Sequence, residues 1–323
     1  MTIQTLGRGL VAAMALFCGS VADGEPVAGD RLLRMGYESA ATGHRREYFV
    51  FLPVGYGQEA GREWPVMLFL HGNGERGDGL DDLDYVLMHG PLMEAWIQRR
   101  PLPFIIISPQ LPVFGELDAI ADRRTGKPAR LEHGAPGRNY GFPSTLPIQR
   151  TGPDEFPDGP HASYDPFSEP QQLPAGWERI DTELIAMVDH VLDEFRTDPS
   201  RVYLTGLSMG GFGAFHMAAR FPDRWAAMAA IVATGRPENA GTLAEAGLPI
   251  WMFGGGKDTI VKPHWLYTMA RALEEAEHPA LRFTMHEDMD HDAWKRVYAG
   301  QDLYDWFLRY RSDERPARPE KSQ

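Results

Sequence analysis

Residues 201–211, RVYLTGLSMGG, decide the fold of this chain. The first five are mostly apolar or β-branched, which favours a buried strand, and the residues that follow as far as Arg220 favour a helix. Between them stands the pattern Gly-x-Ser-x-Gly, with Ser208 at its centre. Because glycine has no Cβ, a strand and a helix can meet there in a very tight turn. The pattern predicts a turn that lifts the Ser208 hydroxyl group clear of the sheet.

Elements on both sides of this turn alternate between strands and helices. Some expected strands, such as residues 66–70, are continuous apolar runs, which are typical of strands buried on both faces of a parallel sheet. We expect strands at 47–52, 66–70, 104–108, 201–205, 227–232, 250–253 and 281–286, and helices at 182–195, 210–220, 263–277 and 293–309. This order predicts an α/β fold with a mostly parallel central sheet and helices on both faces.

A serine hydroxyl group becomes a useful nucleophile only beside a base, and the base needs an acid that orients it. Asp258 follows the expected strand at 250–253, 50 residues after Ser208. His291 follows the strand at 281–286, another 33 residues along the chain. The carboxyl ends of parallel strands meet at one edge of a sheet. We therefore predict that Ser208, His291 and Asp258 act as nucleophile, base and acid.

The region around His291 allows two other interpretations, a different base and a metal site. His286 is the nearest alternative base, but it lies within an expected strand, where we expect a packed or solvated side chain. Asp288, Asp290 and Asp292 surround His291 and could suggest a metal site. Consecutive acids in a turn are usually solvated, and no second histidine or cysteine lies at ligand spacing. We therefore predict neither a metal ion nor any other cofactor.

A glycine-rich stretch, HGNGERGDG at 71–79, follows the apolar strand at 66–70. Its flexible backbone can turn N–H groups toward the serine. We expect the backbone N–H groups of Asn73 and Met209 to form an oxyanion hole, in which each donor typically stabilises the transition state by about 3 kcal/mol. The stretch could also be read as a phosphate-binding loop, but it lacks the Gly-Lys-Ser/Thr ending of that motif.

Taken together, these motifs resemble the secreted single-domain esterases of the α/β-hydrolase superfamily. The residues that carry the resemblance are HGNGERG (71–77), Pro109-Gln110, the Ser208 turn, DTIV (258–261) and HDAW (291–294). The similar families are the phospholipase/carboxylesterases and the polyhydroxybutyrate-depolymerase or feruloyl-esterase-like proteins, often also labelled predicted peptidases of the prolyl-oligopeptidase group. The resemblance implies an α/β-hydrolase fold, a triad of Ser208, Asp258 and His291, and oxyanion donors on Asn73 and Met209.

The resemblance covers roughly residues 45–110 and 177–310, and the chain departs from the family pattern at two places. Asp290 stands before His291 where relatives commonly have glycine. Residues 112–176 form a much longer connection than usual and hold 11 of the 26 prolines without any sustained apolar period. Long insertions of this kind often bind ligands. We expect this Pro/Gly-rich insertion to form a lid or a wall of the substrate pocket.

Residues 1–22 are typical of a secretory signal peptide. Arg8 precedes an apolar run at 9–17, and small residues end the segment at Ala22. The run is too short to cross the hydrocarbon layer of a bilayer, which is about 30 Å thick. Cys18, the only cysteine, lies inside this segment, so the mature chain would contain no disulfide. We expect cleavage after Ala22 and a secreted or periplasmic protein.

The composition is that of a globular protein, with 43% hydrophobic and 24% charged residues among 323. We expect a single domain at 23–311 and a flexible tail at 312–323. The net charge of −13 repels phosphate backbones, so nucleic acid is not an expected partner. No stable membrane insertion is expected either, and the sequence does not define the oligomeric state.

The predicted function is a secreted serine hydrolase that cleaves carboxylic esters through an acyl-enzyme intermediate. Its partner would be a small-molecule or polymer-borne ester, and the sequence does not identify the substrate-binding residues. Two alternatives stay open. The same triad could serve a peptidase or amidase of the prolyl-oligopeptidase-like group, although no β-propeller domain is evident in the sequence. The chain could also be a non-catalytic binding protein with a hydrolase fold.

Overall fold

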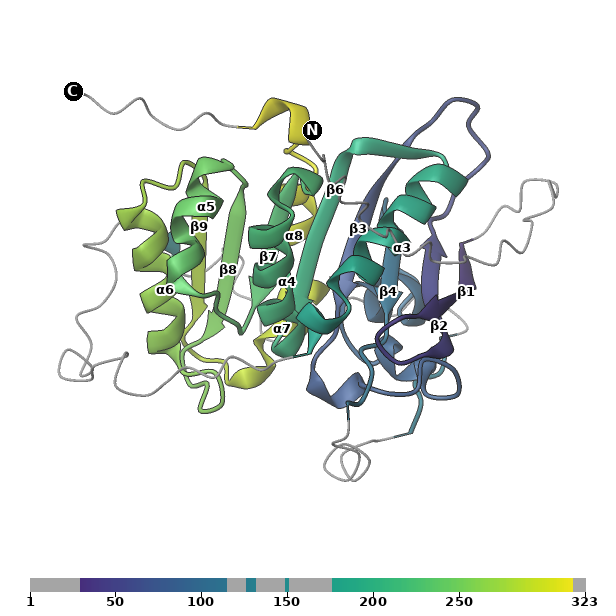
Figure 1. Ribbon diagram of the computed structural model, residues 1–323, viewed down its shortest axis with the longest axis horizontal. Coiled ribbons are helices and arrows are strands. Elements are labelled where there is room, and N and C mark those ends of the chain that lie inside the picture. Colours follow the sequence, from purple (N-terminus) through teal and green to yellow (C-terminus); the bar gives the residue numbers. More distant parts are fainter. Residues whose placement is uncertain (1–29, 115–125, 132–148, 151–175, 316–323) are drawn as a thin grey trace, which may run out of the picture.

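The computed structural model describes residues 30–114, 126–131, 149–150 and 176–315. The expected signal peptide at 1–22, most of the insertion at 112–176 and residues 316–323 of the tail expected at 312–323 lie outside these ranges, whereas Ser312–Glu314 form a 3₁₀ turn. The described residues form one sheet of nine strands in the order β1-β2-β4-β3-β6-β7-β8-β9-β5 (Figure 1). The three predictions on the segments outside these ranges therefore remain predictions.

The sheet is parallel in its centre and antiparallel at both margins. The strands are β1 (Arg31–Ser39), β2 (His44–Leu52), β3 (Trp64–Leu70), β4 (Ile105–Pro109), β5 (Gln149–Arg150), β6 (Thr197–Leu207), β7 (Ala227–Ile231), β8 (Ile250–Gly255) and β9 (Leu281–His286). The helices are α1 (Gly90–Leu92), α3 (Asp181–Glu194), α4 (Met209–Arg220), α5 (Ala240–Glu245), α6 (Pro263–Glu275), α7 (Trp294–Ala299) and α8 (Asp302–Phe307). Antiparallel pairs join β1 to β2, β2 to β4 and β5 to β9, while the neighbours from β4 to β9 are parallel. This arrangement confirms the predicted α/β fold.

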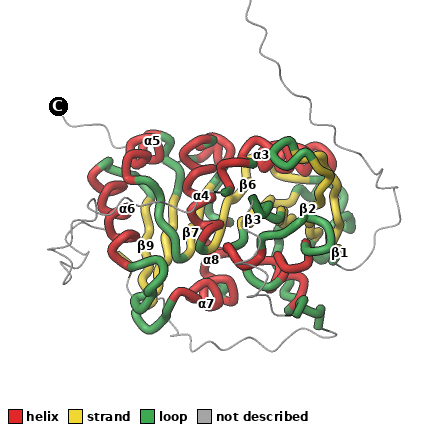
Figure 2. The backbone as a smooth tube through the Cα atoms, turned by 60° about the horizontal axis from the view of Figure 1, so that its bottom comes forward, coloured by secondary structure: helices red, strands yellow, loops and turns green. Residues whose placement is uncertain are grey.

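Helices cover both faces of the sheet because its central strands are apolar on both sides. In β3, Val66, Leu68 and Leu70 face one hydrophobic cluster, whereas Met67 and Phe69 face the other. Side chains alternate between the faces of a strand, so one apolar run supplies both clusters. Helices α3, α4, α5 and α6 pack on the first face, and α7 and α8 pack on the second (Figure 2). The short helix α1 also contributes to the second cluster.

All seven predicted strands are present, with small differences at their ends. The largest difference is in β6, which begins at Thr197 rather than at residue 201. The edge strand β1 was not predicted from the sequence. Only Tyr37 and Ser39 are buried in it, so it lacks the continuous apolar run by which the central strands were recognised. Its antiparallel pairing with β2 is a tertiary feature.

The single helix predicted at 293–309 is wrong. The structure has two short helices there, because the backbone of Gly300 is extended (φ −71°, ψ 168°) and ends α7. Tyr298 in α7 and Tyr304 in α8 are both buried, and the Tyr304 hydroxyl group donates to the Tyr298 carbonyl oxygen at 2.9 Å. The break lets both helices bury their aromatic residues on one face of the sheet. Among the described residues, no helix is long and apolar enough to span a bilayer.

Candidate active site

Ser208 is the single residue between β6 and α4, and its backbone is strained. Its φ of +48° and ψ of −121° lie in a region that residues with a side chain rarely adopt. The Ser208 N–H donates to the Ile231 carbonyl oxygen at 2.9 Å, which ties the turn to the end of β7. Such strain typically costs about 1–3 kcal/mol and is concentrated at functional sites. The turn predicted from the sequence is therefore present.

The two glycines of the pattern are required by close backbone contacts. A Cβ on Gly206 would lie 2.2 Å from the Gly210 carbonyl oxygen. A Cβ on Gly210 would lie 1.9 Å from the carbonyl oxygen of Leu70, the last residue of β3. Any side chain at these positions would push the helix away from the sheet. Glycine therefore allows α4 to begin directly against the carboxyl ends of β3 and β6.

The structure brings Ser208, His291 and Asp258 within hydrogen-bonding distance of one another. His291 Nε2 lies 3.0 Å from Ser208 Oγ, and His291 Nδ1 lies 2.8 Å from Asp258 Oδ2. Asp258 is only 4% exposed, and its Oδ1 accepts the N–H groups of Ile260 and Val261 at 2.8 and 2.9 Å. A carboxylate can only accept, so the ring proton of His291 resides on Nδ1. Nε2 is thereby left to accept a proton from the serine hydroxyl group.

The loop that carries His291 is built around Asp290 and Gly255. Asp290 has an extended backbone (φ −94°, ψ −157°), and its Oδ1 accepts the His291 N–H at 2.7 Å. The Asp290 carbonyl oxygen would lie 2.2 Å from a Cβ on Gly255, so the loop packs directly on the end of β8. No left-handed conformation is needed at position 290. The aspartate that replaces the family's common glycine is therefore accommodated and caps the turn before the histidine.

The acids around His291 are exposed to solvent, as predicted, and two of them also pair with basic side chains of α7. Both oxygens of Asp288 accept hydrogen bonds from Arg296, at 2.7 and 2.5 Å, and Asp292 pairs with Lys295 at 2.9 Å. The hydrogen bonds from Arg296 lower the pKa of Asp288 to about 2. These carboxylates hold the histidine loop to α7. Among the residues that the structure describes, no group of three His, Cys, Asp or Glu side chains could hold a metal ion.

His286, the alternative base, lies in a different environment from His291. It is 1% exposed at the end of β9, where Arg296 Nη1 lies 3.4 Å from its Nδ1. Its ring stacks on Phe253 with the ring centres 6.3 Å apart. Burial lowers the pKa of His286 to about 4. The prediction of a packed strand residue is therefore correct, and the structure places His291 rather than His286 beside the serine.

The expected oxyanion donors lie on two segments that meet beside Ser208. Asn73 begins a short 3₁₀ turn, Asn73–Glu75, directly after β3, and Met209 is the first residue of α4. Leu70 pairs with Gly206 in the sheet, so the loop after β3 and the serine turn leave the same edge. The side-chain Oδ1 of Asn73 accepts a hydrogen bond from Arg76 Nη1 at 3.2 Å. Both segments thus begin at the edge of the sheet that carries Ser208.

Sequence reasoning missed a group of buried side chains that shapes this loop. His71 is fully buried, and its Nε2 accepts the Leu111 N–H at 2.8 Å. Its Nδ1–H therefore donates to the Gly72 carbonyl oxygen at 2.6 Å. Gln110 donates through Nε2 to the carbonyl oxygens of Glu75 and Asp82, at 2.8 and 2.7 Å. His71 and Gln110 belong to the motifs that carry the family resemblance, and their presence in those motifs was the sequence signal that could have identified them.

Buried histidines predict a loss of stability in acid. Burial lowers the pKa of His71 to about 3 and those of His278 and His286 to about 4, so the unfolded chain takes up these protons near pH 6.5 and the folded protein does not. Burial raises the pKa of Glu75 to about 7, which has the opposite effect for one proton. The contribution of the histidines should therefore be complete above about pH 7, and the free energy of unfolding should fall by about 1.4 kcal/mol per pH unit for each net proton below pH 6.

Urea unfolding at several pH values between 7.5 and 4.5 measures this slope. The exposed residue His44 offers a control, because His44→Gln should leave the dependence of the unfolding free energy on pH unchanged. Constant or rising stability on acidification would contradict the prediction.

Two aromatic rings lie in sequence beside His291, those of Trp294 and His89. The indole of Trp294 meets the His291 ring edge to face, with centres 5.2 Å apart. The ring of His89, whose side chain is 29% exposed, packs at a tilt against the Trp294 ring, with the ring centres 5.5 Å apart. The wall predicted from the sequence was the insertion at 112–176, most of which lies outside the described residues. Sequence reasoning did not assign Trp294 and His89, and this pair of rings beside the base is called the aromatic wall below.

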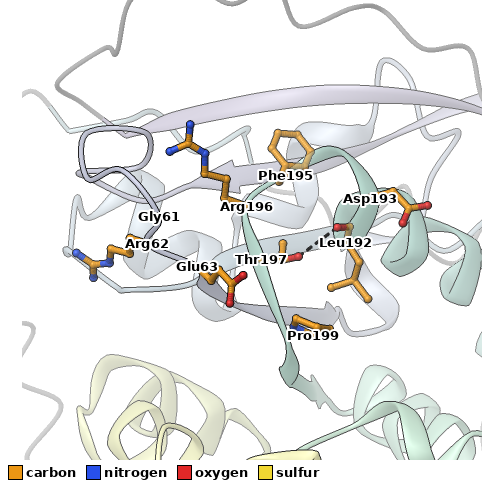
Figure 3. A pocket seen from close by; sticks show the side chains of 9 residues that line it. All are labelled: Gly61, Arg62, Glu63, Leu192, Asp193, Phe195, Arg196, Thr197 and Pro199. Atoms are coloured by element: carbon orange, nitrogen blue, oxygen red, sulfur yellow. Dashed lines mark hydrogen bonds between the residues drawn. The ribbon is translucent and has the colours of Figure 1, made fainter.

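A cavity of about 570 Å³ lies at the opposite end of the strands (Figure 3). It is lined by Gly61, Arg62, Glu63, Leu192, Asp193, Phe195, Arg196, Thr197 and Pro199. Thr197 begins β6, whereas Ser208 follows the end of that strand. Because β3 and β6 are parallel, their amino ends share one edge of the sheet and their carboxyl ends share the other. This cavity is therefore not part of the serine site.

Comparisons with known proteins agree with this architecture. The chain matches the family model described as Esterase over residues 148–302, a range just short of half the chain that includes Ser208, Asp258 and His291. A comparison with curated proteins gives no match. The fold and the family match support an enzyme that hydrolyses esters.

Several solved structures share the α/β-hydrolase fold with this chain. A thermostable esterase is 21% identical with a TM-score of 0.55, and the alignment covers 87% of this chain and 63% of that one. An S-formylglutathione hydrolase from Agrobacterium tumefaciens is 19% identical with a TM-score of 0.51, and the shares are 88% and 96%. A ferulic acid esterase from Anaeromyces mucronatus is 16% identical with a TM-score of 0.51, and the shares are 89% and 93%. The chain therefore has the α/β-hydrolase fold.

Proposed function

We propose that this protein is a serine hydrolase that cleaves carboxylic esters through an acyl-enzyme intermediate. The observation that carries the proposal is the line of hydrogen bonds from Asp258 through His291 to Ser208. Ser208 Oγ would attack the ester carbonyl carbon while His291 Nε2 takes the hydroxyl proton. Asp258 would hold the ring in the required tautomer and stabilise its charged form. The backbone N–H groups of Asn73 and Met209 would bind the oxyanion.

The two half-reactions balance through the same histidine. When the carbon–oxygen bond of the tetrahedral intermediate breaks, His291 returns its proton to the leaving alcohol, and the acyl group stays on Ser208. A water molecule then attacks the acyl carbon while His291 accepts one of its protons. The proton passes to Ser208 Oγ as the acid leaves, which restores the free enzyme.

Substrate and location complete the proposal. The substrate is a small-molecule or polymer-borne ester, and the protein is exported after loss of residues 1–22. The proposal is supported by the motif order, by the match to an esterase family and by the signal-like composition of the first 22 residues. N-terminal sequencing of the exported protein tests the second part, with Asp23 expected as the first residue.

Matched ester and amide substrates test the chemistry. With the same acyl group and a leaving group of the same shape, kcat/KM should be at least about 100-fold higher for the ester, because an alcohol leaves more readily than an amine that must be firmly protonated. A panel that varies acyl chain length, feruloyl esters, acetylated sugars and polyester films then defines the ester. A kcat/KM for the amide equal to or higher than that for the ester would favour the peptidase hypothesis.

A further inference from the structure

The buried carboxyl group of Glu75 lies against the loop that carries Asn73. Glu75 ends the 3₁₀ turn Asn73–Glu75, and the residue is only 5% exposed. The backbone N–H groups of Gly72 and of Glu75 itself lie close enough to its carboxylate to favour the charged form. One carboxylate oxygen, Oε2, lies 3.3 Å from the point that a Cβ on Gly72 would occupy. The acid therefore touches the residue that immediately precedes the expected oxyanion donor.

Gly72 is held on both of its backbone polar groups. The Glu75 carboxylate faces the Gly72 N–H, and His71 Nδ1–H donates to the Gly72 carbonyl oxygen at 2.6 Å. The Gly72 carbonyl and the Asn73 N–H belong to one planar trans peptide, so they point in opposite directions. The bond from His71 to the Gly72 carbonyl therefore sets the direction of the Asn73 N–H, and the Glu75 carboxylate faces the peptide on the other side of Gly72. A loop of small residues would otherwise have considerable freedom at this point.

Two histidines face the carboxylate from neighbouring elements. His71 Nδ1 lies 3.9 Å from Oε2, and His89 Nε2 lies 3.8 Å from Oε1. His89 in turn contacts Trp294, whose indole meets the ring of His291. Glu75 thus lies between the loop of Asn73 and the aromatic wall beside the base.

Burial of this acid is costly, which argues against a role in stability alone. Burial raises the pKa of Glu75 to about 7, so the folded protein holds a charge there at pH 8 at the expense of stability. A neutral side chain of the same shape would avoid this cost. A group that lowers stability while it fixes a loop beside the serine is typical of functional sites.

We propose that Glu75 is a positioning residue of the oxyanion hole, whose carboxyl group holds Gly72 so that the Asn73 N–H points at the reacting carbonyl oxygen. The inference rests on the proposed function, because it assigns a task to a residue beside that site. It predicts that loss of the acceptor at position 75 weakens binding of the transition state much more than binding of the ester itself.

Glu75→Leu and Glu75→Gln separate this role from a structural one. Glu75→Leu removes the acceptor and should lower kcat by about 10- to 100-fold with KM changed less than about threefold, because an oxyanion exists only after attack. Glu75→Gln keeps an oxygen that can accept the Gly72 N–H, so its kcat should stay within about threefold of wild type. It should also unfold at a temperature a few degrees higher than wild type at pH 8, and at about the same temperature at pH 4.

Glu183→Leu is the matched control. Glu183 is a buried carboxylate that accepts a backbone N–H, from Ala41 at 2.9 Å, and the Ser39 hydroxyl group at 3.1 Å, at the β1 margin of the fold. Its loss should lower the unfolding temperature without changing kcat per active site. Active sites are counted by the total extent of fluorophosphonate labelling, so partial unfolding does not imitate a loss of kcat.

The outcomes separate this inference from the proposed function. Full ester hydrolysis by Ser208→Ala would overturn both. An inactive Ser208→Ala together with wild-type kcat in Glu75→Leu would overturn only the inference. If Glu75→Leu does not fold, Glu75→Asp replaces it, because the shorter side chain keeps the charge but withdraws from the Gly72 N–H. A drop in kcat of at least about fivefold in Glu75→Asp supports the role, and an unchanged kcat overturns it.

Discussion

Replacement of Ser208 with alanine is expected to lower kcat for ester hydrolysis by about 10⁴-fold or more while the fold is retained. The variant loses the oxygen that would attack the ester and carry the acyl group, and His291 Nε2 loses the hydroxyl group 3.0 Å away. The turn should survive because the hydrogen bond to Ile231 comes from the backbone N–H of residue 208. Steady-state kinetics and thermal unfolding measure the two effects.

Ser200→Ala is the control for this prediction. Ser200 lies near the amino end of the same strand, where its hydroxyl group donates to Asp198 at 2.6 Å. It should keep full activity and full labelling by a fluorophosphonate, whereas Ser208→Ala should show neither. Labelling of Ser208→Ala to the wild-type extent would mean that the nucleophile lies elsewhere.

Asp258→Asn is expected to reduce kcat by about 10⁴-fold at neutral pH with little change in the overall fold. The N–H groups of Ile260 and Val261 both donate to Oδ1, so the amide oxygen of the asparagine should take that place. The amide NH₂ would then face Nδ1 of His291, where Oδ2 now lies 2.8 Å away. Two donors cannot face each other, so the ring would carry its proton on Nε2 and could no longer accept one from Ser208.

Asp292→Asn provides the comparison, because Asp292 lies next to His291 in the chain and pairs with Lys295 instead of the imidazole. This variant should retain more than about half of the wild-type kcat. The pH dependence of kcat measured for both variants shows whether the asparagine at 258 acts on the histidine. Retention of a tenth or more of the activity by Asp258→Asn would contradict the role of Asp258 as the orienting acid.

Much of the fold could be predicted because it depends on local pattern. The apolar run of β3 predicts a strand covered on both faces, and the glycines at 206 and 210 predict a close approach of strand and helix. Asp258 and His291 each follow a strand end, which places them at the same edge as Ser208. In the structure, the His291 ring lies within hydrogen-bonding distance of both Ser208 and Asp258. The variants above test the roles of these residues in catalysis.

Prediction failed where neighbours in space decide the structure. The helix expected at 293–309 is divided at Gly300, because two short helices pack their aromatic residues on the sheet. Asp288 is exposed, as expected, but its pairing with Arg296, which is 3% exposed, was not predicted. The sequence contains the charges of this pair, but a pattern of acids in a turn does not reveal which basic side chain lies beneath it.

The sequence by itself determined the central strands, the serine turn and the identity of the three residues at its edge. Each of these depends on residues close together in the chain, through side-chain periodicity and the absence of a Cβ. Only the tertiary structure decided how the loop after β3 is held. Parallel pairing of β3 with β4 brings the Leu111 N–H to His71, 40 residues away. The same pairing brings Gln110, which follows β4, to the Glu75 carbonyl oxygen at 2.8 Å. Burial of an acid depends on such neighbours in space, which the local sequence does not show.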